Sequence, residues 1–216
     1  MNSASDFLDD GPHHSPATLL LAHGAGGAMD SAGMQSATEA LVAAGLRVLR
    51  FEFDYMAARR TGGRKPPPKA ETLVPEYGAA VAAARAYIGS ERLVVGGKSM
   101  GGRVASKVAD DLHNTGDIAG LLCLGYPFHP PGRPTKTRTA HLEALHVPTL
   151  IVQGTRDPFG TEEEVAGYTL SPSIELLWMS DGDHDLMPRK GVSGFNAADH
   201  RAAMAASVRA WVERLR

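Results

Sequence analysis

Short apolar runs alternate along the chain with alanine-rich segments in which apolar residues recur at helical spacing. Apolar runs of strand length that alternate with helical segments favour a parallel sheet covered by helices on both faces. The pattern therefore predicts a three-layer α/β/α sandwich with about six mainly parallel strands. The predicted strands are 17–22, 46–53, 92–96, 118–124, 148–153 and 174–179, and the predicted helices are 31–44, 74–88, 100–114, 161–169 and 197–215.

Two helix starts carry capping chemistry, and two long segments fit neither helix nor strand. Thr161 followed by Glu164 predicts a capping box, and Asn196 is a favourable N-cap for the last helix. Residues 57–72 form a basic, proline-rich loop, and residues 125–146 form a polar excursion. Long irregular segments within a domain are often functional, so we expect both loops to shape a binding site.

The size of the chain indicates one domain, and its charge excludes some partners. We expect residues 16–216 to form that domain and residues 1–15 to be a mobile N-terminal extension. The net charge of −2 gives no general attraction to nucleic acid or to an anionic membrane, so we expect neither as a partner. No apolar run approaches the roughly 20 residues of a spanning helix, and residues 1–16 lack the pattern of a secretory signal.

The chain has a single cysteine, Cys123, which excludes an internal disulfide and is compatible with a reducing cytoplasm. We therefore expect a cytoplasmic protein. Cys123 lies in the apolar run "IAGLLCLG", which indicates a strand in the core. Reactive thiols need polar, partly exposed surroundings, so we favour a core role over a catalytic one.

The stretch "VVGGKSMGGRV", residues 94–104, carries the strongest chemical signal. It has the G-x-S-x-G spacing of a nucleophile elbow, in which a serine lies on a sharp turn between a strand and a helix. The small residues Gly97 and Gly101 allow such a turn, and Ser99 would project above the sheet beside the amides of a helix N-terminus. The alternative is a glycine-rich turn with an idle serine. Lys98, inside the motif, is expected to point away from the chemistry.

A serine nucleophile needs a base and an acid that orients the base. In this architecture the partners follow in the order serine, acid, histidine, each beyond a later strand. "PTLIVQGTRDPFG" puts Asp157 after one strand, and "IELLWMSDGDHDL" puts His184 after the next. We therefore predict a triad of Ser99, Asp157 and His184.

Three aspartates flank His184 and offer other readings of that loop. Asp181, Asp183 and Asp185 could hold the histidine or bind a metal, but loops rich in Asp and Gly are usually solvated turns. No second cluster supplies metal ligands at a familiar spacing, so we predict no metal site and no cofactor. His129, in the polar excursion, is a candidate to line the substrate pocket.

The turn "HGAGG", residues 23–27, follows the first predicted strand. Turns of this type contribute a backbone donor to an oxyanion hole, and the second donor is the amide after the nucleophile. We therefore predict the amides of Ala25 and Met100 as the oxyanion hole. A phosphate-cradling loop is the alternative, although the spacing of nucleotide-binding motifs is absent. His23 would brace the turn.

Together, "LLLAHGAGG", "VVGGKSMGGRV", "VQGTRDPFG" and "DGDHDL" resemble the α/β-hydrolase superfamily over nearly the whole chain. The phrases "FEFDYM", "GGKSMGGR", "LGYPFHPPGRP" and "QGTRDPFG" are similar to the dienelactone-hydrolase-related subgroup that includes testis-expressed and NSL-complex-subunit-like proteins. The resemblance implies an α/β-hydrolase fold with little or no lid. It also implies the same nucleophile, acid and base. Dienelactone hydrolases proper use a cysteine nucleophile, so Ser99 argues against their ring-opening reaction here.

Aromatic and methionine residues follow the predicted strands, at the edge where a substrate would rest. They suggest a partly apolar pocket, although packing within the loops would explain them equally well. The basic residues of the first loop are either a solvated surface or an attraction for an acidic substrate or partner. The predicted pocket residues are Tyr55, Met56, Tyr126, Phe128, Phe159 and Met187, and the basic residues are Arg59, Arg60, Arg64, Lys65 and Lys69.

These observations predict a serine hydrolase that cleaves a small carboxylic ester, thioester or lactone through an acyl-enzyme. Its partner is then a small-molecule substrate. A perhydrolase or a carbon–carbon bond hydrolase would use the same residues. The alternative from another class is a non-catalytic scaffold that keeps the fold and binds partners through its loops.

Overall fold

The computed structural model describes residues 7–63 and 66–215. Within them, seven strands form one sheet in the order β1-β3-β2-β4-β5-β6-β7, and only β1 runs antiparallel to its neighbour. This confirms the predicted mainly parallel α/β sandwich. The strands are β1 (Leu8–Asp10), β2 (Thr18–Ala22), β3 (Arg47–Phe51), β4 (Leu93–Lys98), β5 (Gly120–Leu124), β6 (Thr149–Gly154) and β7 (Ile174–Met179).

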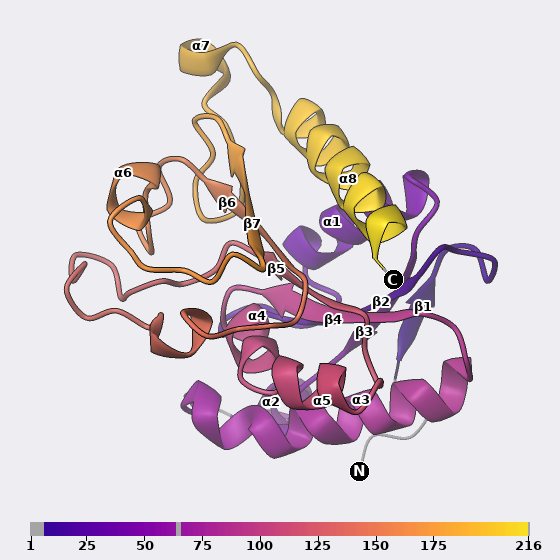
Figure 1. Ribbon diagram of the computed structural model, residues 1–216. Coiled ribbons are helices and arrows are strands. Elements are labelled where there is room, and N and C mark those ends of the chain that lie inside the picture. Colours follow the sequence, from indigo (N-terminus) through magenta and orange to yellow (C-terminus); the bar gives the residue numbers. More distant parts are fainter. Residues whose placement is uncertain (1–6, 64–65, 216) are drawn as a thin grey trace.

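Helices cover both faces of this sheet (Figure 1). Helices α1 and α8 pack together on one face, and α2 to α5 lie on the other. The bounds are α1 (Ala32–Ala43), α2 (Asp54–Arg60), α3 (Val74–Ile88), α4 (Met100–Ser106), α5 (Ala109–Asn114), α6 (Glu162–Val165), α7 (Lys190–Ser193) and α8 (Ala197–Arg214), with short 3₁₀ turns at Ala70–Leu73 and Ala140–Leu142.

The core consists of two apolar layers, one on each face of the sheet. Successive side chains of a strand point to opposite faces. In β2, Leu19 and Leu21 therefore join the layer under α1 and α8, while Leu20 and Ala22 join the layer under α3 and α4. A strand buried on both faces needs a continuous apolar run, which is why the central strands were predictable.

Strand β1 was not predicted, because Leu8–Asp10 has no apolar pattern of its own. Charge pairs fix it on β3: Arg47 lies 2.7 Å from Asp9, and Arg50 lies 2.8 Å from Asp10. The predicted extension 1–15 thus contributes an edge strand, although its residues 1–6 lie outside the described residues.

The predicted helices and loops differ from the structure in three places. The predicted helix 100–114 is divided into α4 and α5, and the predicted helix 161–169 is only one turn, α6. The predicted loop 57–72 begins inside α2, and Arg64 and Lys65 lie outside the described residues. Both predicted helix starts are confirmed, since capping boxes form at Thr161 and at Asn196.

None of the described helices has the length and apolar character that crossing a membrane requires.

Candidate active site

The carboxyl ends of the parallel strands meet at one edge of the sheet, and four turns leave the strands there. They follow β2, β4, β6 and β7 and carry His23–Gly27, Ser99, Asp157 and His184. Ligands of open α/β sheets bind at this edge. The fold therefore brings together segments that are far apart in the sequence.

Ser99 lies on a sharp turn between β4 and α4. Its backbone has a positive φ of 51° with ψ −115°, a combination that is rare for a residue with a side chain. A Cβ atom on Gly97 would lie 2.4 Å from the carbonyl oxygen of Ala22, and one on Gly101 would lie 2.5 Å from the same oxygen. Only glycine allows α4 to approach β2 so closely, as the motif predicted.

The side chains of Ser99, His184 and Asp157 form a continuous hydrogen-bonded chain. His184 Nε2 lies 2.8 Å from Ser99 Oγ, and His184 Nδ1 lies 2.8 Å from Asp157 Oδ2. In the tautomer that satisfies both contacts, Nδ1 donates to the carboxylate and Nε2 accepts from the hydroxyl. Of the three residues predicted as a triad, His184 thus lies within hydrogen-bond distance of both Ser99 and Asp157.

Asp157 is fully buried and is held by two further donors. The backbone N–H of Phe159 donates to Oδ1 at 2.8 Å, and the Gln153 amide donates to Oδ2 at 2.9 Å. A buried carboxylate is costly unless it is paired and hydrogen-bonded, and these donors, with His184, provide that compensation. Gln153 was not predicted as a site residue, because it lies in a buried strand where a polar residue gives no periodic signal.

Lys98 ties the segment after His184 to the turn that carries Ser99. Its ammonium donates to the backbone carbonyl of His184 and forms an ion pair with Asp185 at 3.1 Å. The prediction that Lys98 points away from the chemistry was therefore wrong. The signal was available, since a lysine at the carboxyl end of a central strand must emerge at the edge where Ser99 lies.

The other aspartates of this loop stabilise its backbone. Asp181 pairs with Arg189, which lowers the pKa of Asp181 to about 2. The Asp183 carboxylate accepts from the backbone N–H groups of Asp185 and Met187, both at 2.9 Å. Within the described parts of the chain, no group of three or more His, Cys, Asp or Glu side chains is arranged to hold a metal ion.

The glycine-rich turn after β2 passes directly beside Ser99. A Cβ atom on Gly24 would lie 3.7 Å from Ser99 Cβ, and Ala25 borders the same cavity as Ser99. The Tyr55 hydroxyl donates to the carbonyl of Ala25 at 3.1 Å, and burial raises the pKa of Tyr55 to about 12. The hydroxyl therefore stays protonated as a donor. Met100 begins α4, where the first N–H groups of a helix have no partner within the helix.

The buried ring of His23 links this turn to the segment after β3. It is fully buried; its Nδ1 lies 2.7 Å from the carbonyl oxygen of Gly24, and its Nε2 accepts from the backbone N–H of Phe53 at 3.2 Å. Burial lowers the pKa of His23, which favours the neutral ring that this geometry requires.

A cavity of about 410 Å³ lies over Ser99 and His184. Of the predicted pocket residues, Phe159 lines it, and the Phe159 ring lies 4.3 Å from the His184 ring between centroids. Met187 lines a neighbouring cavity instead. The cavity residues are Gly24, Ala25, Gly26, Gly27, Ser31, Gly33, Met34, Lys98, Ser99, Phe159, His184 and Asp185.

The other four predicted pocket residues do not line this cavity. Tyr55, Met56, Tyr126 and Phe128 are buried in the core layer under α2 to α5. Their position after a strand was correct, but the chain turns inward there, so the apolar side chains pack rather than face the cavity. His129, another candidate, is also buried and lies 3.2 Å from Glu164.

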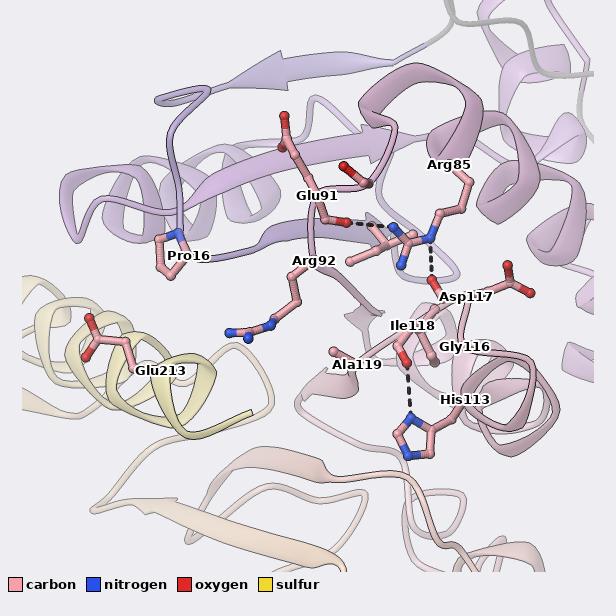
Figure 2. A pocket seen from close by; sticks show the side chains of 12 residues that line it. Pro16, Arg85, Glu91, Arg92, His113, Gly116, Asp117, Ile118, Ala119 and Glu213 are labelled. Atoms are coloured by element: carbon pink, nitrogen blue, oxygen red, sulfur yellow. Dashed lines mark hydrogen bonds between the residues drawn. The ribbon is translucent and has the colours of Figure 1, made fainter. Parts of the chain in front are cut away.

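A larger hollow, of about 920 Å³, lies at the opposite edge of the sheet, where β4 and β5 begin (Figure 2). Arg85 donates there to the carbonyls of Asp117 and Glu91, and the His113 ring contacts the carbonyl of Ile118 at 3.0 Å. These contacts brace loops, and none of the predicted site residues lies in this hollow. Size alone does not identify the site.

Known proteins with the same architecture were found among solved structures. A serine hydrolase without a lid from Xanthomonas campestris is 22% identical, with a TM-score of 0.69 over 95% of this chain and 88% of the other. A dienelactone hydrolase from Anabaena variabilis is also 22% identical, with a TM-score of 0.69 over 97% and 92%. An α/β serine hydrolase homologue from Coxiella burnetii is 19% identical, with a TM-score of 0.64 over 99% and 94%.

At these identities the likeness of the solved structures concerns the fold. The family is shown by a separate match, in which the model of the alpha/beta hydrolase domain covers residues 15–213. That range contains all four turns at the carboxyl edge of the sheet. The chain belongs to the α/β-hydrolase family.

Proposed function

We propose that this protein is a serine hydrolase that cleaves a small carboxylic ester, thioester or lactone through an acyl-enzyme. Ser99 is the nucleophile, His184 the general base and Asp157 the residue that orients the base. The observation that carries the proposal is the unbroken chain of two 2.8 Å contacts from Ser99 Oγ through the His184 ring to Asp157. A hydroxyl is a weak nucleophile unless a base accepts its proton, and this chain supplies the base.

In the first half-reaction Ser99 Oγ attacks the carbonyl carbon while its proton passes to His184 Nε2. The carbonyl oxygen becomes a tetrahedral oxyanion, and Asp157 stabilises the imidazolium. Collapse of this intermediate breaks the bond to the leaving group, which takes the proton from His184. In the second half-reaction His184 takes a proton from water, the water oxygen attacks the acyl carbon, and the free acid leaves as the proton returns to Ser99.

The oxyanion would be held by the backbone N–H groups of Ala25 and Met100. The support is local: Ala25 lies in the turn beside Ser99, and Met100 begins the helix that Ser99 precedes. Donors fixed before the reaction stabilise developing charge in a site with little water, and losing one typically costs about 3 kcal/mol in the barrier. Tyr55 and His23 fix the Ala25 turn through its carbonyls, so the N–H groups keep their direction.

We further propose that the chain falls in the dienelactone-hydrolase-related subgroup. The support is the set of motifs quoted above, together with the fold it shares with the Anabaena variabilis enzyme. The serine at position 99 favours ester or thioester cleavage over the reaction of the cysteine enzymes.

Labelling with a fluorophosphonate probe tests the function directly, because such probes react with activated serine hydroxyls. The wild-type protein should be labelled, and Ser99→Ala should not. Ser106→Ala is a matched control, since Ser106 is buried in α4 away from the cavity and its loss should leave labelling intact.

A folded wild-type protein that remains unlabelled would contradict the proposal and favour the scaffold alternative. Labelling that persists in Ser99→Ala would contradict the assignment of the nucleophile. Ester hydrolysis in a panel of varied acyl length and charge then identifies the substrate class, with Ser99→Ala as its blank.

A further inference from the structure

A second cavity, of about 290 Å³, opens beside the cavity over Ser99. It lies between the start of α1, the segment after His184 and the start of α8. None of its lining residues is part of the predicted triad or oxyanion hole. Its lining residues are Ala32, Gly33, Met34, Ser36, Ala37, Lys98, Leu124, Asp185, Leu186, Met187, His200, Arg201 and Met204.

The two cavities share a boundary. Gly33, Met34, Lys98 and Asp185 line both of them. Asp185 directly follows His184, and Lys98 directly precedes Ser99, so the second cavity starts within one residue of the reacting groups on each side. A substituent of a substrate bound at Ser99 therefore has a short route into it.

The lining of the second cavity is mainly apolar. Met34, Leu124 and Met204 are buried, whereas Met187 is 41% exposed. Methionine side chains are flexible and polarizable, so they adapt to chains of different shape. An apolar cavity of this kind favours an alkyl group over a polar one, because a polar group would lose its water without replacement.

Three of the four ionisable residues that line the cavity, Lys98, Asp185 and His200, already have partners. Lys98 pairs with Asp185, and the His200 ring contacts the backbone carbonyl of Leu186 at 2.8 Å. These contacts leave the apolar residues as the main surface offered to a ligand. Ser36 and Arg201 are partly exposed and complete the rim.

We propose that this second cavity binds an unbranched alkyl chain of the substrate, carried either by the acyl group or by the alcohol. The inference rests on the proposed hydrolase function and adds a substrate class to it. Each methylene that leaves water for an apolar cavity contributes about a fourfold gain in kcat/KM, until the cavity is filled.

Two ester series distinguish the two sources of the chain. Phenyl esters from acetate to octanoate vary the acyl group, and acetate esters from methanol to octanol vary the alcohol. In one series kcat/KM should rise about fourfold per methylene and then level off. A flat profile in both series would overturn the proposal.

Ala37→Leu tests the location. Ala37 lines only the second cavity, one helical turn from Gly33, so a leucine there fills it without reaching Ser99. In this variant the ratio of kcat/KM for the longest chains to kcat/KM for the shortest ester should fall about fourfold for each methylene displaced. Ala43→Leu, on the exposed end of the same helix, is the matched control.

Met204→Ala makes the opposite change by deepening the cavity, and it should move the plateau to longer chains. Thermal melting of each variant checks folding. An Ala37→Leu loss that is equal at all chain lengths, or a Met204→Ala plateau that does not move in a folded protein, would overturn the proposal.

A binding measurement separates this inference from the proposed function. Methionine-methyl NMR of Ser99→Ala with hexan-1-ol or hexanoate should shift Met187 and Met204, which line the second cavity but not the cavity over Ser99. The signal of Met56, in the opposite core layer, should stay unchanged. Absence of these shifts would overturn the cavity assignment even if fluorophosphonate labels the wild type. Shifts without any labelling would support the cavity while contradicting the serine hydrolase.

Discussion

At the scale of single residues, the two groups that flank the proposed nucleophile and base are joined to each other. Lys98 precedes Ser99, Asp185 follows His184, and their side chains form an ion pair at 3.1 Å. The same ammonium donates to the His184 carbonyl. The Lys98 side chain therefore links the His184 loop to the turn that carries Ser99, and we infer that it positions the proposed base.

We predict that Lys98→Met lowers kcat on short esters about tenfold or more, with little change in KM. A hydrogen bond from a charged group contributes about 1.5–3 kcal/mol, and its loss lets the imidazole move from the serine. Steady-state kinetics measures the split between kcat and KM.

Lys107→Met is the matched control, because Lys107 pairs with Glu71 away from the cavity. Lys98→Arg should restore part of kcat. An unchanged kcat in a folded Lys98→Met protein would contradict the positioning role.

At the scale of elements, the sequence predicted those helices and strands whose formation depends on residues close together in the chain. The six apolar strands and the caps at Thr161 and Asn196 depend on neighbouring residues in the chain, and they were found. Strand β1 was missed because it depends on Arg47 and Arg50 of a distant strand.

The same distinction explains the site. The elbow and the order of serine, acid and histidine are written in motifs, so the residues that the structure brings together could be named beforehand. The motifs do not show whether a side chain that follows a strand points into the core or into the cavity. Tyr126 and Phe128 therefore resembled pocket residues but are fully buried, and Lys98 appeared remote but lines the cavity.

The junction of β4 with α4 allows a prediction about stability. Gly97→Ala should lower the free energy of unfolding by about 1–3 kcal/mol, because the new methyl group would meet the Ala22 carbonyl at 2.4 Å. Gly78→Ala is the opposite control. Gly78 is in α3, and apart from the neighbouring backbone of that helix no atom lies within 4 Å of the added Cβ, so the substitution should stabilise the protein by up to about 1 kcal/mol. Urea unfolding measures both, and equal effects of the two substitutions would contradict the close approach of α4 to β2.

At the scale of the whole molecule, histidine burial makes stability depend on pH. His141 Nε2 lies 2.8 Å from the hydroxyl of Ser106, and burial lowers the pKa of His141 from 6.5 to about 4. The unfolded chain takes up this proton near pH 6.5, whereas the folded chain stays neutral until about pH 4. The contribution of the neutral, buried His141 to the free energy of unfolding is therefore fully present above pH 6.5. It is lost as the pH falls from 6.5 to about 4. Burial also lowers the pKa of His23, so His23 adds to the same pH dependence of stability.

We predict that the free energy of unfolding falls as the pH is lowered from 6.5 to 4, and that His141→Gln makes this fall shallower. The contribution of one histidine cannot exceed about 1.4 kcal/mol per pH unit, and partial exposure of the ring reduces it. Urea unfolding across this pH range measures the slope. His14→Gln, at an exposed position, should leave it unchanged. An identical slope in His141→Gln would contradict the assignment.

The buried thiol of Cys123 can serve as a native probe of local unfolding. The thiol lies in β5 behind α4, is 1% exposed, and contacts the carbonyl of Gly102 at 3.6 Å. Burial also raises its pKa, so a thiol reagent reacts only after the centre of the sheet has opened. The chain has no other cysteine, so the rate of thiol modification measures how often the structure around Cys123 opens. This measurement reports on the region next to the Ser99 turn and needs no engineered label.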